Sequence, residues 1–224
     1  FYPDHSGLSN FAHRITSLTR WNFLPNTSMT LDANVTITHF LEDSREASSD
    51  HDATSSAGEN YTSYPFRIKY GMQGLILSRL SFALGLGYAY VKYENDNNEH
   101  MFIMNARLAY DFRDNIRLAL EYRKDFDNAI FGDYYKFHRV SLAFDAIWFD
   151  RLMTQAELGY GYFDFRALDM SRADHLITAK LAVDYHFFPG LSLGVAYRLN
   201  LNASDFDKAD YSRHAFTLSL TYEY

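Results

Sequence analysis

The sequence predicts an all-β fold, an antiparallel transmembrane β-barrel of about eleven or twelve strands. Three observations support this: segment after segment alternates apolar and polar residues, short and long connections alternate, and aromatic residues are abundant. The 224 residues include 18 Tyr and 19 Phe but only 4 Pro, and aromatic residues make up 17% of the chain. Such an excess without a long apolar run is typical of strands that meet a membrane interface.

About eleven segments show the period-two alternation of strand side chains. In "LSFALGLGYAYVKY", every second residue from Phe82 to Tyr90 is Phe, Leu or Tyr, and the residues between them are Ala or Gly. The expected strands begin near residues 11, 28, 64, 80, 100, 115, 136, 152, 174, 191 and 212.

The expected connections are of two kinds. Short turns are predicted at Pro25-Asn26, Ser78-Arg79, Arg113-Asp114-Asn115, Asp150-Arg151 and Pro189-Gly190. Longer polar loops are predicted at "EDSREASSDHDATSSAGENYTS", "ENDNNEH", "DNAIFGDYYK", "RALDMSRAD" and "NASDFDKADYS". Short periplasmic turns at one end and longer extracellular loops at the other are the arrangement of an outer-membrane barrel.

Composition excludes other classes. No stretch of about 18 consecutive apolar residues is present, so a membrane-spanning helix is not expected. The net charge of −7 argues against a nucleic-acid partner, and the absence of Cys suits an oxidising cell envelope. A soluble β-sandwich or lipocalin-like barrel is the alternative. It would carry surface Lys and Glu opposite its apolar face, where this chain carries Gly, Ala, Ser and Thr.

If Leu, Val, Phe and Tyr face lipid, the opposite face lines the lumen. The charged residues predicted there have both signs interleaved on neighbouring strands, which favours a lumen packed by Arg-carboxylate pairs and water over an open diffusion pore. These residues are Arg67, Lys69, Arg107, Asp111, Glu121, Arg123, Arg139, Asp145, Glu157, Lys180, Asp184 and Arg198.

Five histidines recur in register, each just before the apolar alternation of a strand that leaves a long loop. They are His13, His100, His138, His175 and His214. Period two places them on the lipid-facing side, in a belt at the outer interface. Each is interpreted either as a girdle residue equivalent to Tyr or as a contact for phosphate or sugar of lipopolysaccharide, stronger below about pH 6.5, where imidazole is protonated. Neighbouring belt positions lie roughly 10 Å apart, too far to share a metal ion, so neither a metal nor a cofactor is predicted.

No enzyme is predicted. The sequence contains no G-x-S-x-G elbow, no H-E-x-x-H and no Gly-rich phosphate loop, and no catalytic residues are assigned.

The chain ends in "HAFTLSLTYEY", whose alternation assigns Phe216, Leu218, Leu220 and Tyr222 to lipid and Tyr224 to a periplasmic aromatic girdle. The segment resembles the carboxy-terminal signal that outer-membrane assembly machinery reads. We therefore expect a periplasmic carboxy terminus.

The segments "HRITSLTRWNFLPNTSMTLDANV", "YPFRIKYGMQGLILSRLSFALGLGYAYVKY", "YYKFHRVSLAFDAIWFDRLMTQAELGYGYFDF" and "DYSRHAFTLSLTYEY" resemble outer-membrane β-barrel porins of the BBP2 type, often found beside exopolysaccharide export systems. The resemblance extends over nearly the whole chain. It rests on the recurring pattern of hairpins and on the Tyr/Asp-x-x-His/Arg start of the strands that run from a long loop toward a short turn. It implies an integral barrel of a Gram-negative outer membrane and supplies no catalytic residues.

Two functions follow as expectations. One is a porin-like channel for small solutes or polysaccharide, and the other is a scaffold with a plugged lumen that anchors a partner complex. The expected partners are outer-membrane lipid, lipopolysaccharide, the barrel-assembly machinery and other envelope proteins. Residues 1–224 are expected to form one barrel domain. Because an odd strand count leaves an open edge, a strand upstream of Phe1 or a strand from another chain is expected to close it.

Overall fold

The computed structural model describes residues 10–40, 63–93, 98–128, 134–167, 170–206 and 209–222. Eleven strands occupy these ranges, as the sequence predicted, and each begins within four residues of its expected start, the largest difference being residue 170 against 174. The strands are β1 (Asn10–Leu24), β2 (Thr27–Phe40), β3 (Ser63–Leu77), β4 (Leu80–Tyr93), β5 (Glu99–Arg113), β6 (Ile116–Asn128), β7 (Tyr134–Trp148), β8 (Leu152–Ala167), β9 (Met170–Phe188), β10 (Leu191–Ser204) and β11 (Tyr211–Tyr222).

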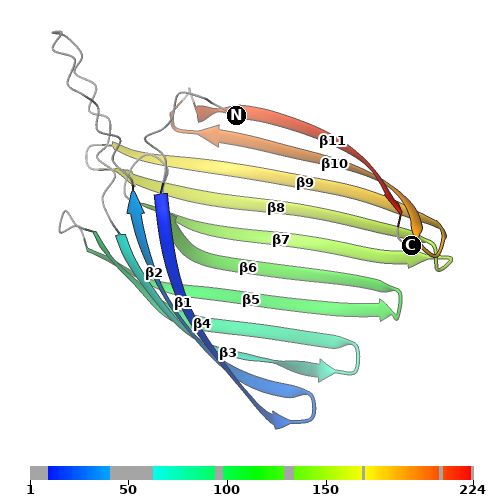
Figure 1. Cartoon of the computed structure of the whole chain (residues 1–224), viewed down its shortest axis with the longest axis horizontal. Coiled ribbons are helices and arrows are strands. Elements are labelled where there is room, and N and C mark those ends of the chain that lie inside the picture. Colours follow the sequence, from blue (N-terminus) through cyan, green and yellow to red (C-terminus); the bar gives the residue numbers. More distant parts are fainter. Residues whose placement is uncertain are drawn as a thin grey trace.

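The strands form one antiparallel sheet in chain order from β1 to β11 (Figure 1). The sheet curls into a trough, which confirms the predicted all-β, antiparallel class. The closed wall of the predicted barrel is not observed, because no pairing within the described residues joins β1 to β11. Both edge strands therefore have one side without a neighbouring strand.

The five short turns lie where the sequence predicted them, and we call their end of the sheet the turn end. The β7–β8 turn holds Phe149 and Asp150 at φ 54° and 57°, the left-handed values of a hairpin turn whose twist matches its strands. At the opposite, loop end the strands run further than expected. A loop was predicted over residues 166–174, but β8 extends to Ala167 and β9 begins at Met170. Ladder hydrogen bonds need no apolar side chains, so pairing continues into the polar sequence.

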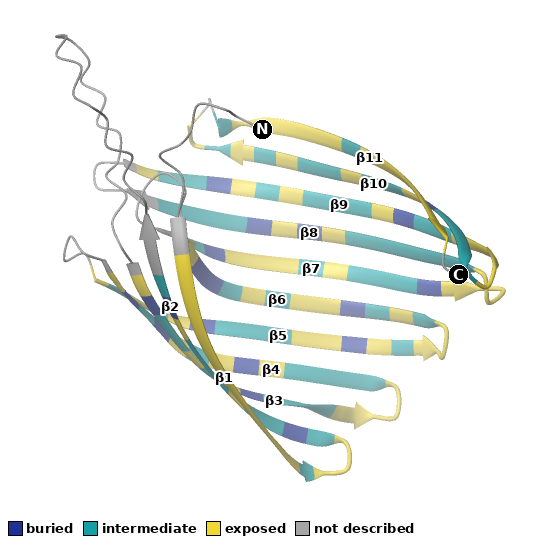
Figure 2. Ribbon diagram, viewed as in Figure 1, coloured by how far each residue is buried: buried dark blue, intermediate teal, exposed yellow. Residues whose placement is uncertain are grey.

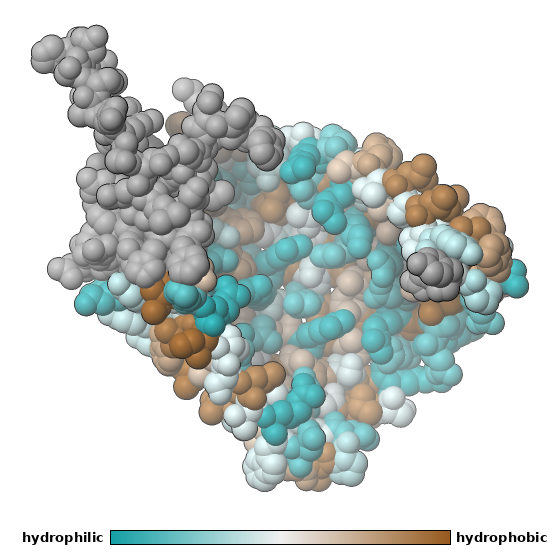
Figure 3. Space-filling model, viewed as in Figure 1, coloured by the Kyte–Doolittle hydropathy of each residue, from teal (hydrophilic) through white to brown (hydrophobic). Residues whose placement is uncertain are grey.

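Within the described ranges the sheet is a single layer, and no second layer of described residues covers its apolar face. Leu158, Leu181 and Leu218 on this face are 58%, 54% and 75% exposed. Figure 2 shows buried residues only as short isolated bands along the strands, and Figure 3 looks into the hollow, where hydrophilic side chains project in the middle. A soluble sandwich would bury the apolar face against a second sheet, so that alternative is wrong. Within the described ranges, no helix has the length and apolar character needed to cross a membrane.

We predict that the two faces of β4 tolerate charge very differently. Leu84→Lys places an ammonium group on the apolar convex face and should lower the free energy of unfolding in lipid vesicles by about 2–4 kcal/mol. The neighbouring Ala83→Lys borders a cavity of about 450 Å³ on the concave face and should cost less than about 1 kcal/mol. Urea unfolding of both variants measures the difference. Equal losses would contradict the assignment of the convex face to lipid.

Candidate functional site

The concave face collects the charged residues that the sequence assigned to the lumen. Residues directly opposite each other on paired strands share a face. The register links Arg67 to Ala89, Lys69 to Asp32, and Arg107 to Glu121 in this way. Arg123 stands opposite Arg139 and lies on the same face. Applied strand by strand, the register also places these residues there: Asp111, Asp145, Glu157, Lys180, Asp184 and Arg198.

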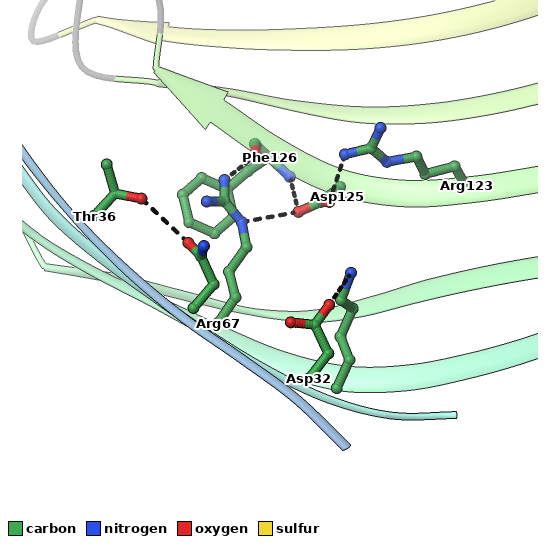
Figure 4. A network of polar contacts seen from close by, with 8 residues as sticks. Asp32, Thr36, Arg67, Arg123, Asp125 and Phe126 are labelled. Carbon is green, nitrogen blue, oxygen red and sulfur yellow. Dashed lines mark hydrogen bonds and ion pairs between the residues drawn. The ribbon is translucent and has the colours of Figure 1, made fainter. Parts of the chain in front are cut away.

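One polar network crosses the hollow near the loop end (Figure 4). Arg67 on β3 reaches Asp125 on β6, with 3.4 Å between Nε and Oδ1, and donates from Nη2 to the carbonyl oxygen of Phe126 at 2.7 Å. Arg123 Nη2 approaches Asp125 Oδ2 at 2.9 Å. The Asp125 side chain is only 8% exposed. Because β4 and β5 lie between β3 and β6, the two Arg67 contacts span the concave space instead of following the wall.

A change of direction in β6 brings Asp125 to this position. The β5–β6 pairing ends at Met104 opposite Lys124, whereas the β6–β7 pairing continues to Asn128 opposite Tyr134. Beyond Lys124, β6 thus follows β7 and leaves β5. Phe126 then packs on the concave side against Ala89, Val91 and Ile103 and is itself 4% exposed. This apolar cluster holds the inward-leaning segment in place.

Further ion pairs tie the strands together. Lys136 of β7 meets Glu99 of β5 at 3.1 Å, across the place where β6 has turned away. Pairs between neighbouring strands join Lys69 to Asp32 at 3.2 Å, Arg117 to Asp111 at 2.6 Å, and Arg139 to Glu157 at 3.2 Å. Lys180 Nζ donates to Gln155 Oε1 at 3.3 Å. Within the described residues, no ion pair is formed by the remaining predicted lumen residues Arg107, Glu121, Asp145, Asp184 and Arg198, nor by Lys180.

The histidine row lies on the convex face near the loop end, and four of its members contact a tyrosine on the preceding strand. Hydrogen bonds of 2.8, 2.7 and 2.8 Å join Nδ1 of His138, His175 and His214 to Tyr122, Tyr160 and Tyr197. The rings of His100 and Tyr88 are stacked at 6.2 Å. Each tyrosine stands opposite the residue two places after its histidine. The sequence prediction missed these tyrosines, although their recurrence once per hairpin was a usable signal. His13 lies on β1, whose neighbour has Val35 at the corresponding position.

The strand assigned to the assembly signal forms one edge of the sheet. Phe216, Leu218, Leu220 and Tyr222 project from the same face of β11 and are among the most exposed apolar residues described. Among the described strands, β11 pairs with β10 alone. Tyr224 lies outside the described residues.

No family model and no curated protein matches the chain. Among solved structures, it is similar to the iron transporter FrpB of Neisseria meningitidis, with TM-score 0.70 and 9% identity over 96% of this chain and 41% of that one. It is also similar to the outer-membrane ferripyoverdine receptor of Pseudomonas aeruginosa, with TM-score 0.62 and 12% identity over 96% and 36%. The NanC porin gives TM-score 0.47 at 9% identity over 98% and 96%.

The chain thus spans about two fifths or less of the first two structures. At these identities the likeness shows the fold alone, an antiparallel sheet like the wall of an outer-membrane β-barrel. Membership of the BBP2-type family stays a prediction. Among the described residues, no group of three His, Cys, Asp or Glu side chains is placed to hold a metal ion.

We predict that Phe126→Ala releases the inward-leaning end of β6. Truncation of a buried Phe costs about 3–5 kcal/mol, and this segment has backbone bonds to β7 only, so its amides should exchange with solvent at least about tenfold faster. Hydrogen-exchange mass spectrometry of peptides covering residues 120–128 measures the effect. Phe102→Ala, which truncates an exposed Phe of β5 on the convex face, is the control. Equal exchange in the two variants would show that Phe126 does not hold the segment.

Proposed function

We propose that the protein is a porin-like channel of a Gram-negative outer membrane whose lumen carries small polar solutes. The observation that supports this best is the contrast between the two faces of the sheet. The convex face offers an apolar surface to lipid, and the concave face offers charged groups and cavities to water. In this proposal the turn end is periplasmic, with the carboxy terminus there, and the loop end faces outward.

The Arg67-Asp125-Arg123 network serves as the constriction of the proposed channel. It is built on the wall by the bent end of β6 and fixed by the Phe126 cluster, so it needs no loop folded into the lumen. At the turn end the concave face widens into the cavity of about 450 Å³, bordered by Arg20, Arg107 and Arg117. Of these three, only Arg117 has a carboxylate partner within the described residues. The proposed path is therefore narrow at one end and open at the other.

The same network also favours a second function, a scaffold that holds a partner complex at the outer membrane. An ion-pair network across the hollow would plug a lumen if side chains from the rest of the wall filled the remaining space. In that case the loops and the rim of the sheet would perform the function. They would bind the envelope partners and make any link to polysaccharide export. Electrical measurement separates the two functions, because only the channel conducts.

We predict that Arg67→Ala raises the single-channel conductance by about twofold, because it removes the guanidinium group that spans the constriction. Lys69→Ala is the matched control. It removes one positive charge from the same face of the same strand, but its partner Asp32 lies on the neighbouring strand along the wall. Recordings in planar bilayers of the protein purified from outer membranes test this. A current that changes equally in both variants would argue against the constriction, and the absence of current in the wild type and both variants would favour the scaffold.

Outer-leaflet lipopolysaccharide is the proposed partner of the histidine belt. A neutral imidazole that accepts the tyrosine hydroxyl at Nδ1 carries its own hydrogen on Nε2, so each His-Tyr pair leaves one donor for the lipid headgroup. In His214 this Nε2 lies 3.0 Å from Ser212 Oγ, so there the hydroxyl shares it. The assembly machinery is proposed to read the exposed β11 edge, where a partner strand can add to the sheet.

We predict that replacing the five belt histidines by Gln lowers the lipopolysaccharide that co-purifies with the protein and abolishes its pH dependence. Wild-type retention should be higher at about pH 5.5 than at about pH 7.5, since a protonated imidazole attracts phosphate. Phosphate analysis of the purified protein measures retention. The matched control changes Tyr122, Tyr160 and Tyr197 to Phe, which removes the hydroxyls but keeps every imidazole, so the pH dependence should persist. Unchanged retention and pH response in the Gln variant would leave the belt as an interfacial girdle only.

A further inference from the structure

We propose that a cavity on the concave face of β6, β7 and β8 binds a ring of a neutral saccharide. The cavity has a volume of about 380 Å³, within the roughly 300–1,000 Å³ typical of small-ligand sites. Tyr135, Phe137 and Phe163 form its aromatic side, and Glu121, Arg139 and Glu157 are among its charged groups. The inference deepens the proposed function and rests on it, because it places this cavity in the water-filled lumen.

One ring on the aromatic side of the cavity, that of Phe163, lies against the wall of the sheet. A Cβ atom added to Gly161 would come within 2.6 Å of Cε2 of Phe163, so the Phe163 ring covers the glycine. Only a residue without a side chain permits this close approach. This edge of the ring therefore lies against the wall at Gly161, and Phe163 also lines the cavity.

Two neighbouring rings lie on the same side of the cavity. Phe137 lies 5.8 Å from Phe163, centroid to centroid, at an interplanar angle of 27°, and Tyr135 lies 5.9 Å from Phe163 at 50°. An aromatic face carries partial negative charge and attracts the weakly positive C–H groups of an apolar surface laid on it. A pyranose ring has such a C–H face, with its hydroxyl groups at the edge.

The charged groups around the rings have both signs, and this selects against ions. Arg139 is paired with Glu157 at 3.2 Å, and Arg123, over the Phe137 ring at 5.2 Å, is paired with Asp125. Glu121 has no hydrogen-bond or ion-pair partner within the described residues. An anion would meet the carboxylates, and a cation would meet the guanidinium groups. A hydroxyl both donates and accepts, so a neutral polyhydroxylated ligand can satisfy both kinds of group.

A purely structural role for the rings makes a different prediction. An aromatic side chain that covers a strand glycine stabilises a sheet by itself, and that role requires no ligand. A purely structural role for the rings also assigns no role to the unpaired Glu121 carboxylate beside them. Binding measurements decide between the two, because a structural ring leaves the protein indifferent to saccharides.

Isothermal titration calorimetry of the detergent-solubilised protein tests the proposal, with the α-1,4 and β-1,4 glucose hexamers as neutral probes and a galacturonate hexamer as the anionic comparator. We expect saturable binding of at least one neutral hexamer and weaker binding of the galacturonate. Phe163→Leu keeps apolar volume but removes the ring face and should weaken binding at least about tenfold. Gly161→Ala keeps every ring but displaces Phe163 and should do the same, whereas Phe163→Tyr should bind normally.

Tyr162→Ala is the matched control, because Tyr162 adjoins Phe163 on β8 but faces the convex side against His175. Its saccharide affinity should equal that of the wild type. The proposal is overturned if neither neutral hexamer saturates, if galacturonate binds more tightly than both, or if Phe163→Leu binds as tightly as the wild type. Calorimetry requires no conduction, so a conducting protein without saccharide binding refutes this inference alone. A protein that binds saccharide but does not conduct refutes the channel function and supports the saccharide site.

Discussion

The structure depends on the backbone hydrogen-bond ladder, because a lipid layer offers no partner to an unpaired amide or carbonyl. Strands β2 to β10 each have a neighbouring strand on both sides, although the β5–β6 ladder stops at Met104 and Lys124, and among the described strands β1 and β11 have a neighbour on one side only. In a sheet of consecutive antiparallel strands, all odd-numbered strands run the same way, so β1 and β11 are parallel to each other in direction. Pairing them directly would make a parallel seam. Closing the wall with antiparallel pairs alone takes an odd number of further strands.

The ladder also explains why the sheet has so little core. Most buried apolar residues are scattered along the concave face, and among the described residues only Ala89, Val91, Ile103 and Phe126 form a cluster. This cluster lies where the ladder is interrupted, beside the part of β6 that has left β5. Side-chain packing and the Lys136-Glu99 pair thus take over where the pairing of β5 with β6 stops early. The site that we describe as a constriction is a consequence of that interruption.

Local properties of the chain were predictable from the sequence, and contacts between distant strands were not. Period two and turn chemistry are decided by neighbouring residues, so the strands and short turns were found within a few positions. Period two alone would place Phe126 on the convex face, yet it packs on the concave side because β6 turns after Lys124. Arg67 and Asp125 lie 58 residues apart, and nothing in either segment specifies the other as its partner. The tyrosines beside the belt histidines were visible in the sequence, but recognising them required the register between strands.

The constriction and the aromatic cavity share Arg123, and this links their proposed roles. Its Nη2 holds Asp125, its guanidinium carbon lies over Phe137, and the same residue borders the cavity. A guanidinium has five N–H donors, so a hydroxyl in the cavity can accept from Arg123 while Asp125 keeps its bond. Asp125 is held from the other side by Arg67, which reaches it across two strands. Loss of Arg67 would therefore leave Arg123 as the only cation on Asp125 and shift the Arg123 guanidinium relative to Phe137. Loss of Lys69, whose partner Asp32 lies on the adjacent strand, leaves this arrangement intact. A solute held in the cavity thus lies beside the constriction, and whatever loosens the constriction also changes the cavity.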